Sequence, residues 1–456
     1  MIRKIKSVIK KLTPKFLLNW YHGFLALAAD FYYGRPSKKM VVIGVTGTAG
    51  KSTVVNLIGK ILEEAGFKVG WISTANFKIG PKEWLNKTKM TMLGRFALQK
   101  FLKKMVLAGC QYAIIETSSE GIIQSRHLGI NYDLAVFTNL HLEHIESHGG
   151  FEKYRAAKMK LFKHLTRYRE KKIVKIGDQI REYSQKIIVA NLDDENAKYF
   201  LKWPADEYYG FAIRDTNLRM HTNDTNKVKK VIAENMKLAS DGAKFKIQNS
   251  EFKIHLLGEF NVYNCLTAIA IALSQGISLE ACQKALEKFK GMPGRMETVI
   301  NQPFKVIVDY AHTPEELEKV YKLLTETYKL ICVLGSAGGG RDKWKRPKLG
   351  ELAEKYCREI VLTNEDPYDE NPATILNEIE AGFSQIRNSK SETLNYWKIL
   401  DRREAIKKAL SLAKPNEIVI ITGKGCEQWI MGPKGQKIPW DDRLVVREEY
   451  RKLQDS

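Results

Sequence analysis

The feature that most constrains this chain is the segment at residues 41–53, where an apolar run leads into a glycine-rich turn. Gly47 and Gly50 carry no Cβ, so the backbone amides of the turn can converge on phosphate oxygens. Lys51 adds a positive charge, and the hydroxyl of Ser52 suits Mg²⁺. The strict pattern has glycine where this chain has Val45. The order of elements still predicts a strand, a phosphate loop and a helix whose N-terminus faces the phosphates.

This loop predicts that the chain binds a nucleoside triphosphate together with Mg²⁺. The nucleotide contacts that we expect from it are Thr46, Gly47, Thr48, Ala49, Gly50, Lys51, Ser52 and Thr53. The loop alone leaves GTPases, kinases and ligases open, so the class of enzyme depends on the rest of the chain.

Short apolar runs alternate with longer helical stretches along the chain after residue 40. Continuous Val, Ile and Leu runs suit strands that are covered on both faces, and their alternation with helices predicts parallel βαβ units. The runs lie at residues 40–45, 112–115, 134–137, 306–308, 331–334, 360–362 and 418–421. Between about residues 200 and 256 the polar, alternating segments 244–248 and 251–256 predict antiparallel strands beside the parallel sheet.

The sequence predicts an α/β protein in three parts. Residues 1–39 form a short basic helical segment, residues 40–294 a central nucleotide-binding domain with a mostly parallel sheet, and residues 295–456 a Rossmann-like α/β domain. The second boundary follows the turn-rich sequence G-M-P-G at 291–294, after which a new βαβ series begins. A chain of 456 residues is long enough for two or three such cores.

The composition excludes several classes of protein. The formal net charge is +22, yet no segment resembles a nucleic-acid-binding module, so we expect no nucleic-acid partner. A lysine-rich surface explains most of the charge, and attraction to an anionic membrane or substrate is the alternative. The six cysteines form no C-x-x-C pair, so we expect neither a disulfide framework nor a zinc-thiolate site. Free cysteines fit a protein of the reducing cytoplasm.

The first 39 residues combine a basic amphipathic stretch with an aromatic one. Residues 1–15 carry six cations and no acid, and apolar residues recur there at helical spacing, at Ile2, Ile5, Ile9 and Leu12. Residues 16–33 are rich in Phe, Leu, Trp and Tyr but are interrupted by Asn19, His22 and Asp30, so they make a poor membrane span. Two readings remain open: a helix that lies on the inner membrane surface, or a helix that docks on the next domain.

Several further segments, taken in order, resemble the Mur ligase family. They are E-T-S-S-E-G at 116–121, T-N-L-H-L-E-H-I-E-S-H-G at 138–149, Y-R-A-A-K-M-K-L-F at 154–162, G-E-F-N-V-Y-N at 258–264 and G-M-P-G-R at 291–295. D-Y-A-H-T-P at 309–314, G-R-D-K-W-K-R-P at 340–347 and G-K-G-C-E at 423–427 resemble the MurE type in particular. Each segment is weak alone, but the ordered set covers about residues 40 to 445 and is specific.

The resemblance implies a ligase that uses ATP and Mg²⁺ to join a muramoyl-peptide-like acid to an amino acid in peptidoglycan precursor synthesis. The acid attacks the γ-phosphate of ATP, and the amine then displaces phosphate from the acyl phosphate. The family's catalytic residues correspond to Lys51, Glu116, His144 and Lys158, and its Mg²⁺ ligands to Ser52, Glu116, His144 and Lys158, the lysine as a carbamate. Asn261 and Asn264 match adenine-side contacts, Arg295 a phosphate-side contact and Asp309 a ribose contact.

The substrate contacts are also implied by the resemblance. They correspond to Thr91, Ser118, Arg126, Glu365, Asp366, Tyr368, Gly423 and Glu427. Tyr368 stands where MurE-type enzymes that use diaminopimelate have an arginine that reads the distal carboxylate. A phenol offers neither charge nor a bidentate fork. We therefore expect a substrate that ends in an ammonium group, such as lysine or ornithine.

The chain departs from the family at several points. Family members have Asn at the position of Ala49, Asp at that of Glu143, and His at those of Glu120 and Cys426. About forty residues precede the phosphate loop, fewer than half of the family's N-terminal uridine-nucleotide domain. We therefore expect the UDP end of the substrate to be held differently or not at all.

Two other readings remain open. One is a related ligase that acts on another acid, of the folylpolyglutamate or cyanophycin type. The other is a P-loop regulatory ATPase at the membrane surface that makes no amide bond. A zinc protease is not expected, because His141, His144 and His148 do not form the H-E-x-x-H spacing.

Overall fold

The computed structural model describes residues 14–143, 145–167, 171–176, 179–183, 185–213, 228–239, 241–383 and 395–455. These residues group into two compact units. The first unit comprises the chain up to Trp84, Lys89–Leu140 and Glu152–Lys290, and the second comprises Leu85–Thr88, His141–Phe151 and Gly291–Ser456. Two short segments from the first half of the sequence therefore belong to the second unit.

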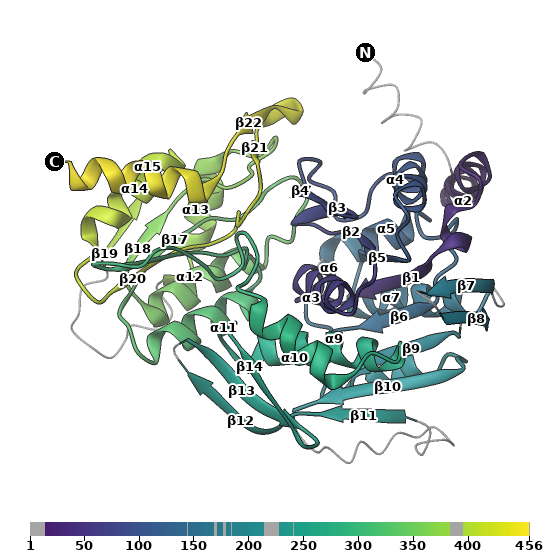
Figure 1. Cartoon of the computed structure of the whole chain (residues 1–456). Coiled ribbons are helices and arrows are strands. Elements are labelled where there is room, and N and C mark those ends of the chain that lie inside the picture. Colours follow the sequence, from purple (N-terminus) through teal and green to yellow (C-terminus); the bar gives the residue numbers. More distant parts are fainter. Residues whose placement is uncertain are drawn as a thin grey trace. The chain divides into compact units, whose positions relative to one another are not determined.

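The first unit is built on a nine-stranded sheet with the strand order β11-β10-β9-β6-β1-β5-β2-β3-β4 (Figure 1). Its strands are β1 (Val41–Thr46), β2 (Val69–Ile72), β3 (Asn76–Ile79), β4 (Lys82–Leu85), β5 (Tyr112–Glu116), β6 (Leu134–Phe137), β9 (Ile187–Asn191), β10 (Glu207–Ala212) and β11 (Val228–Ile232). Neighbouring strands run parallel from β11 to β2, and β3 runs antiparallel to β2. The predicted mostly parallel sheet is confirmed.

The helices of this unit follow the βαβ pattern that the alternating sequence predicts. They are α2 (Lys15–Tyr32), α3 (Lys51–Glu64), α4 (Arg95–Leu107), α5 (Ser119–Ile123), α7 (Phe151–Leu165), α8 (Ala197–Leu201), α9 (Glu259–Ser274) and α10 (Leu279–Lys288), with a 3₁₀ turn at Pro36–Lys39. Every residue of β1, β5 and β6 is buried, as expected for strands covered on both faces. The apolar runs predicted at 40–45, 112–115 and 134–137 form these three strands.

The region between residues 200 and 256 was predicted only in part. A separate three-stranded antiparallel sheet contains β12 (Glu234–Ala239), β13 (Gly242–Ile247) and β14 (Ser250–Ile254), which confirms the two predicted strands. β10 and β11 lie in the same region but extend the main sheet in parallel. A further antiparallel pair joins β7 (Lys172–Ile176) and β8 (Gln179–Tyr183).

The second unit has a six-stranded sheet with the order β15-β16-β20-β17-β18-β19 (Figure 1). Its strands are β15 (Glu297–Ile300), β16 (Lys305–Val308), β17 (Leu330–Leu334), β18 (Cys357–Leu362), β19 (Asn395–Lys398) and β20 (Ile418–Ile421), with the pair β21 (Trp429–Met431) and β22 (Lys437–Pro439) apart from it. Only β15 pairs antiparallel within the six. The predicted runs at 306–308, 331–334, 360–362 and 418–421 form its four central strands.

Helices cover both faces of this second sheet, so its four central strands are mostly buried on both sides. One core contains residues of α11 (Pro314–Thr325), α12 (Lys345–Tyr356) and α13 (Pro372–Glu380), and the other contains residues of α14 (Arg402–Leu412) and α15 (Asp442–Gln454). The short helix α6 (Ile145–His148) also belongs to this unit. The predicted Rossmann-like α/β arrangement is confirmed.

Helix α2 begins the described part of the first unit, and it packs beside α4 (Figure 1). Gly23, Ala26 and Ala29 are buried on its inner face. Docking of this helix on the domain is therefore observed for residues 15–32, whereas the basic stretch at residues 1–13 lies outside the described residues. Among the helices that are described, none has both the length and the apolar character needed to cross a bilayer.

Candidate active site

The glycine-rich turn between β1 and α3 adopts a conformation that requires its glycines. Gly47 has φ +153° and Gly50 has φ +78°, values that residues with a Cβ rarely adopt. A Cβ on Gly47 would lie 2.0 Å from Oγ1 of Thr138, and a Cβ on Gly50 would lie 2.3 Å from Oδ1 of Asn264. The predicted loop is therefore present at the carboxyl end of a central strand, where open α/β sheets bind ligands.

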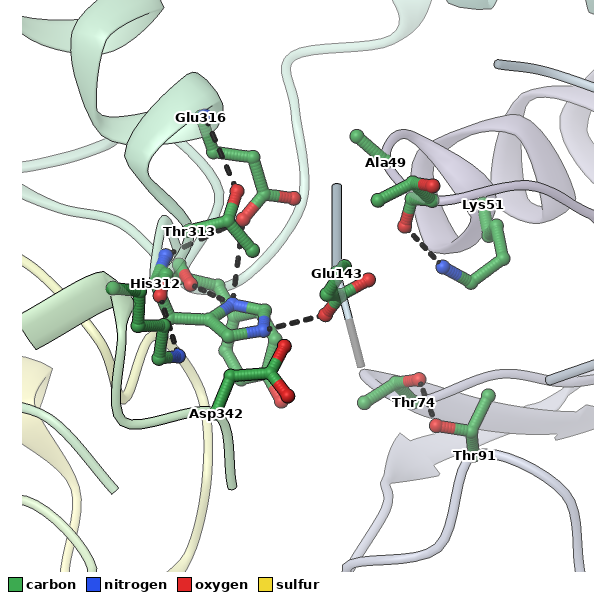
Figure 2. A network of polar contacts seen from close by, with 12 residues as sticks. Ala49, Lys51, Thr74, Thr91, Glu143, His312, Thr313, Glu316 and Asp342 are labelled. Carbon is green, nitrogen blue, oxygen red and sulfur yellow. Dashed lines mark hydrogen bonds and ion pairs between the residues drawn. The ribbon is translucent and has the colours of Figure 1, made fainter. Parts of the chain in front are cut away.

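The residues that follow β6 hold this loop in place. The amide of Ala49 donates to Oδ1 of Asn139 at 2.8 Å, and the hydroxyl of Thr138 donates to the carbonyl of Ala49 at 2.9 Å. The ammonium of Lys51 donates to the carbonyl of Thr48 within the same loop (Figure 2). The charge of Lys51 is thus held over the backbone that the sequence predicts to receive phosphates.

Lys158 lies beside the loop and is only 2% exposed. Its ammonium donates to the carbonyl of Gly47 at 2.6 Å and lies 4.4 Å from the ring centroid of Tyr154. The hydroxyl of Tyr154 is itself 3.1 Å from Oγ1 of Thr48. Lys158 is therefore a buried residue of α7 and not a surface lysine.

Glu116 ends β5 and accepts hydrogen bonds on both oxygens. Oε2 accepts from the hydroxyl of Ser52 and from the amide of Thr74, both at 2.7 Å, and Oε1 accepts from the hydroxyl of Thr74 at 2.8 Å. The side chain of Glu116 is buried. Two of the residues predicted to hold Mg²⁺, Ser52 and Glu116, are therefore in contact.

A hard cation fits this position, because it prefers carboxylate and hydroxyl oxygens. Three or more His, Cys, Asp or Glu side chains do not gather into a metal-binding group anywhere in the described residues. A Mg²⁺ ion held by Ser52 and Glu116 would complete its shell with phosphate oxygens and water, as this ion commonly does. His144, the third predicted ligand, lies outside the described residues.

Thr74 was missed by the sequence reasoning. Its hydroxyl donates to Oε1 of Glu116 and lies 2.9 Å from Oγ1 of Thr91, within hydrogen-bond distance (Figure 2). The predicted substrate residue Thr91 is thus connected to the candidate metal ligand. No local signal marks Thr74, because its contact with Glu116 joins residues 42 positions apart.

Asn261 and Asn264 lie in the first turns of α9, and Asn264 lies against Gly50 of the loop. Both are buried, and the amide of Asn264 donates to Oδ1 of Asn261 at 2.9 Å. Asn261 in turn donates to the carbonyl of Leu257 at 2.8 Å. The structure therefore brings Asn264 to the phosphate loop, with Asn261 hydrogen-bonded to it.

The two remaining substrate predictions in this unit have local partners. Arg126 donates to the carbonyl of Met92, next to Thr91, and to Oε1 of Gln124 at 2.7 Å. Burial lowers the pKa of Arg126. Ser118 is the N-cap of α5 and accepts from the amide of Gly121 at 3.1 Å. Arg126 thus lies beside the predicted substrate loop, whereas the contact observed for Ser118 is a helix cap.

In the second unit, Arg295 and Asp309 lie on either side of Tyr310. The guanidinium of Arg295 is 4.0 Å from the ring centroid of Tyr310. The carboxylate of Asp309 accepts from the amides of Met296 and Ala311, both at 2.7 Å. Burial raises the pKa of Asp309, while Arg295 opposes this shift. Both predicted nucleotide residues therefore occupy one cluster at the end of β16.

The predicted amino-acid contacts also form one cluster in this unit, around a lysine that was not predicted. The ammonium of Lys424 donates to Oδ1 of Asp366 at 2.9 Å, to Oε2 of Glu427 at 2.7 Å and to the carbonyl of Trp429 at 2.7 Å. Burial lowers the pKa of Lys424, but Glu427 and Asp366 outweigh it and raise this pKa. Lys424 lies in the family-like segment G-K-G-C-E at 423–427, between the predicted contacts Gly423 and Glu427.

Glu365, Tyr368 and Gly423 complete this cluster. A Cβ on Gly423 would lie 2.5 Å from Oε2 of Glu365, which explains a glycine with φ +98° there. Tyr368 has φ +53°, and its amide donates to the carbonyl of Met431 at 3.0 Å. Burial and the charge of Asp366 raise the pKa of Tyr368, whereas Arg341 opposes them. Arg341 is therefore a charged neighbour of the phenol.

A second network in this unit fixes the segment at 141–151. His312 lies 3.2 Å from Oε1 of Glu143 through Nε2, and 3.4 Å from Oε2 of Glu316 through Nδ1 (Figure 2). Burial lowers the pKa of His312, but Glu316 and Glu143 outweigh it and raise this pKa. Glu143, which replaces the family's aspartate, is thus held beside a histidine of the D-Y-A-H-T-P segment.

The same segment is held by two carboxylates, Asp342 and Glu146, which each accept from backbone amides of the other's segment. The carboxylate of Asp342 accepts from the amides of Ile145 and Glu146 at 3.1 and 3.0 Å, at the start of α6. Oε1 of Glu146 accepts in return from the amide of Lys343 at 2.9 Å, just before α12. Carboxylates at helix N-termini stabilise them, so Asp342 stabilises the start of α6. Glu146 in return holds the turn that precedes α12.

Comparison with family models identifies two matched regions. Residues 45–272 match the Mur ligase middle domain, and residues 294–425 match the Mur ligase glutamate ligase domain. Both matched regions contain residues of the clusters described above.

Comparison with individual proteins gives relatives over most of the chain. The chain is 36% identical over 440 residues to a UDP-N-acetylmuramyl-tripeptide synthetase of Roseiflexus sp. (strain RS-1), which covers 94% of this chain and 82% of the relative. It is 36% identical to a UDP-N-acetylmuramoyl-L-alanyl-D-glutamate–2,6-diaminopimelate ligase of Halalkalibacterium halodurans, with 94% and 82% covered.

Comparison with solved structures gives the same fold. A UDP-N-acetylmuramoyl-L-alanyl-D-glutamate–2,6-diaminopimelate ligase structure has a TM-score of 0.58 at 29% identity, with 91% of this chain and 79% of that chain covered. A Mycobacterium tuberculosis folylpolyglutamate synthase has a TM-score of 0.65 at 15% identity, with 94% and 95% covered, and this likeness concerns the fold alone.

Proposed function

Because the chain belongs to the Mur ligase family, we propose that it is an ATP-dependent ligase that joins a muramoyl-peptide-like acid to an amino acid. The observation that carries this proposal is the arrangement around the phosphate loop, where Lys51, Lys158 and the Ser52–Glu116 pair all lie. These groups suit a reaction between two anions, because charge neutralisation dominates phosphoryl transfer. In this proposal residues 40–294 form the central domain and residues 295–456 form the C-terminal domain.

The proposed reaction has two steps. An oxygen of the acid attacks the γ-phosphorus of ATP, the bond to the β–γ bridging oxygen breaks, and an acyl phosphate and ADP form. The amine then attacks the acyl carbon, loses a proton, and releases inorganic phosphate as the amide forms. The free energy of ATP is thus used to convert a carboxylate oxygen into a leaving group.

The residues of the loop have separate roles in this proposal. Lys51 neutralises charge on the β- and γ-phosphates, and the amides of the glycine-rich turn bind their oxygens. Ser52 and Glu116 would hold Mg²⁺, which supplies Lewis-acid charge when bound. Lys158 would join them after its amine takes up CO₂, because a carbamate carries negative charge at the place of the ammonium. His144 is the remaining proposed ligand of Mg²⁺.

Residues of both units supply the remaining proposed roles. Asn261 and Asn264 of the first unit would contact the adenine side, whereas Arg295 and Asp309 would contact phosphate and ribose. Glu427 and Asp366 would hold the amino group of the incoming amino acid, since they already bind an ammonium, that of Lys424. Thr91 and Arg126 would contact the acid.

We propose an amino acid with a terminal ammonium, such as lysine or ornithine. Three carboxylates, Glu365, Asp366 and Glu427, lie in this cluster beside the buried ammonium of Lys424, and Tyr368 contributes no charge. The relatives named as diaminopimelate ligases act on an amino acid with a second carboxylate. Arg341 is the cation beside Tyr368 that could receive such a carboxylate, so it is the residue to test.

The experiment that tests the function is phosphate release from ATP with candidate acids crossed against a panel of amino acids. The acids are a UDP-muramoyl dipeptide, the same muramoyl peptide without UDP, and a folate. Release that requires a muramoyl peptide and an amine together supports the proposal. Release with the folate would assign a different acid, and release with neither substrate would indicate a regulatory ATPase.

The location of the enzyme is a further part of the proposal. ATP and free cysteine thiols are typical of the cytoplasm, and the six cysteines are all unpaired and buried. A peripheral contact of residues 1–39 with an anionic membrane is a separate proposal. The exposed side chains of α2 provide the observations that bear on it.

A further inference from the structure

Helix α2 presents large apolar side chains on its outward face. Among the side chains that the structure describes, the exposed apolar ones of this helix are Leu17, Trp20, Tyr21, Phe24, Leu27, Phe31 and Tyr32. Trp20 is 69% exposed, Phe24 56% and Phe31 74%. Positions 20, 24, 27 and 31 recur at intervals of three and four residues, so they form one stripe along the helix.

The opposite face of α2 explains why this stripe points outward. Gly23, Ala26 and Ala29 are buried there, and a Cβ added to Gly129 would lie 2.5 Å from the carbonyl of Ala26. The helix therefore sits close to the body of the unit through its small residues. Its large residues are not needed to hold it there, and they extend away from the core.

A second helix adds to the same surface. Phe96 of α4 is 44% exposed, and its ring centroid lies 6.4 Å from that of Tyr32. Lys100 and Lys104 of α4 are exposed, and α4 contains no acidic residue. The surface thus combines exposed aromatic rings with positive charge.

The residues that follow α2 are also basic. Arg35, Lys38 and Lys39 are exposed, and the guanidinium of Arg35 is 5.9 Å from the ring centroid of Phe31. The one acid of the segment, Asp30, is half-buried, and the sequence at residues 1–13 adds five cations and no acid. Acidic residues are therefore rare in this part of the sequence.

From this arrangement we infer that the outward face of α2 is a peripheral binding site for an anionic lipid bilayer. Aromatic side chains next to Lys and Arg are typical of segments that lie in the membrane interface, with rings among the acyl chains and cations at the headgroups. A second copy of this chain would present the same positive charge, so self-association through this face is disfavoured. The inference does not depend on the reaction that the enzyme catalyses.

The test is co-sedimentation of the full chain with vesicles. One set is phosphatidylcholine alone, and the other is equal parts of phosphatidylcholine and phosphatidylglycerol. We expect binding only to the second set, and weaker binding as salt is raised, because about 0.1 M salt limits charge interactions to roughly 10 Å. Failure to bind the anionic vesicles would overturn the inference.

Two groups of variants separate the contributions. Trp20→Ala and Phe24→Ala should each weaken binding at least about tenfold, because each removes an aromatic ring from the interface. Lys100→Gln and Lys104→Gln should each weaken it about fivefold. Leu444→Ala on α15, where Leu444 is 53% exposed, and Lys322→Gln on α11 are matched controls that should bind like the wild type.

Other outcomes would overturn the lipid as the partner. Equal binding by Trp20→Ala and Leu444→Ala would show that this face does not contact the vesicles. Lipid-free dimers in sedimentation velocity that disappear in Phe24→Ala would assign the face to self-association. Circular dichroism of every variant checks that the fold is retained, which we expect because the altered side chains are exposed.

Discussion

The hydroxyl of Ser52 donates a 2.7 Å hydrogen bond to the carboxylate of Glu116, 64 residues further along the chain. The pairing of β1 with β5 creates this contact, because Val45 and Glu116 lie opposite each other at the ends of these parallel strands. A hydroxyl and a carboxylate that meet at a phosphate loop are suited to share a divalent cation. Neighbouring residues such as Thr74 hold the carboxylate of Glu116 in position, and each can be substituted separately.

Thr74→Val should weaken binding of a divalent cation about tenfold, as substitutions behind metal ligands typically do. The variant loses the 2.8 Å hydrogen bond to Oε1 of Glu116, but it keeps the backbone bond to Oε2. Thr74→Ser is the matched control and should restore binding. The measurement is Mn²⁺ affinity by electron paramagnetic resonance in the presence of ADP, and equal affinity in Thr74→Val would contradict the role of Thr74.

Lys51→Ala should fold normally but lose ligation by about 10²–10³-fold, because one fixed charge is removed from a phosphoryl-transfer site. The ammonium of Lys51 contacts the loop itself, so few packing contacts are lost. Lys60→Ala on the same helix is the control, since Lys60 pairs with Glu63 and Glu83 at the surface. Phosphate release and thermal unfolding measure the two effects. Near-normal turnover of Lys51→Ala would contradict the proposal that this loop binds the phosphates of ATP.

Lys158→Ala should be severely impaired, and a short added carboxylate should restore part of its activity by taking the place of the carbamate. The ammonium of Lys158 is buried 2.6 Å from the carbonyl of Gly47, so a small anion has a defined position there. Lys158→Arg should stay inactive, because a guanidinium cannot bind Mg²⁺. Full activity of Lys158→Arg would show that no carbamate is required. Mass spectrometry of the native protein can detect the added CO₂ directly.

Competition between equal amounts of lysine and diaminopimelate should favour lysine. Loss of one charge-assisted contact costs about 1.5–3 kcal/mol, or roughly 10–150-fold in selectivity. Clear preference for diaminopimelate would contradict the proposal. If that preference then disappeared in Arg341→Ala, the distal carboxylate would be read by Arg341 in place of the family's arginine.

The stability of the first unit should fall as the pH is lowered from about 6.5 towards 4. Burial lowers the pKa of His127 to about 3 and that of His164 to about 4, from 6.5. Both rings are neutral in the folded chain, so their contribution is complete above 6.5, and it is lost as the unfolded chain takes up protons below that value. At pH 5 the loss is about 2 kcal/mol per histidine.

Urea unfolding at pH 5 and pH 8 measures this effect. His127→Phe should retain the aromatic contact with His164, whose ring centroid lies 5.0 Å away, and should lose about half of the acid sensitivity. His312→Gln in the second unit is a control, because the pKa of His312 is shifted in the opposite direction. An unchanged pH dependence in His127→Phe would contradict the assignment.

The sequence predicted the strands well, because seven buried runs of Val, Ile and Leu carry their own signal. It also placed Lys51, Ser52, Glu116 and Lys158 in one site through the family resemblance. The sequence did not indicate that β10 and β11 extend the parallel sheet, since the direction of pairing depends on neighbouring strands that are separate in the sequence. Thr74 and Lys424 were missed because their partners are distant in sequence or were assigned to other roles.

Asp342 and Glu146, which are 196 positions apart, each accept backbone hydrogen bonds from the other's segment, and this has a consequence for recombination within the family. A chimera joined at residue 290 would inherit a foreign C-terminal half but retain the native residues 141–151. The donor and the acceptor of each of these bonds would then come from different parents. Gene shuffling between distant relatives should therefore tolerate exchange of residues 291–456 best when residues 141–151 are exchanged with them.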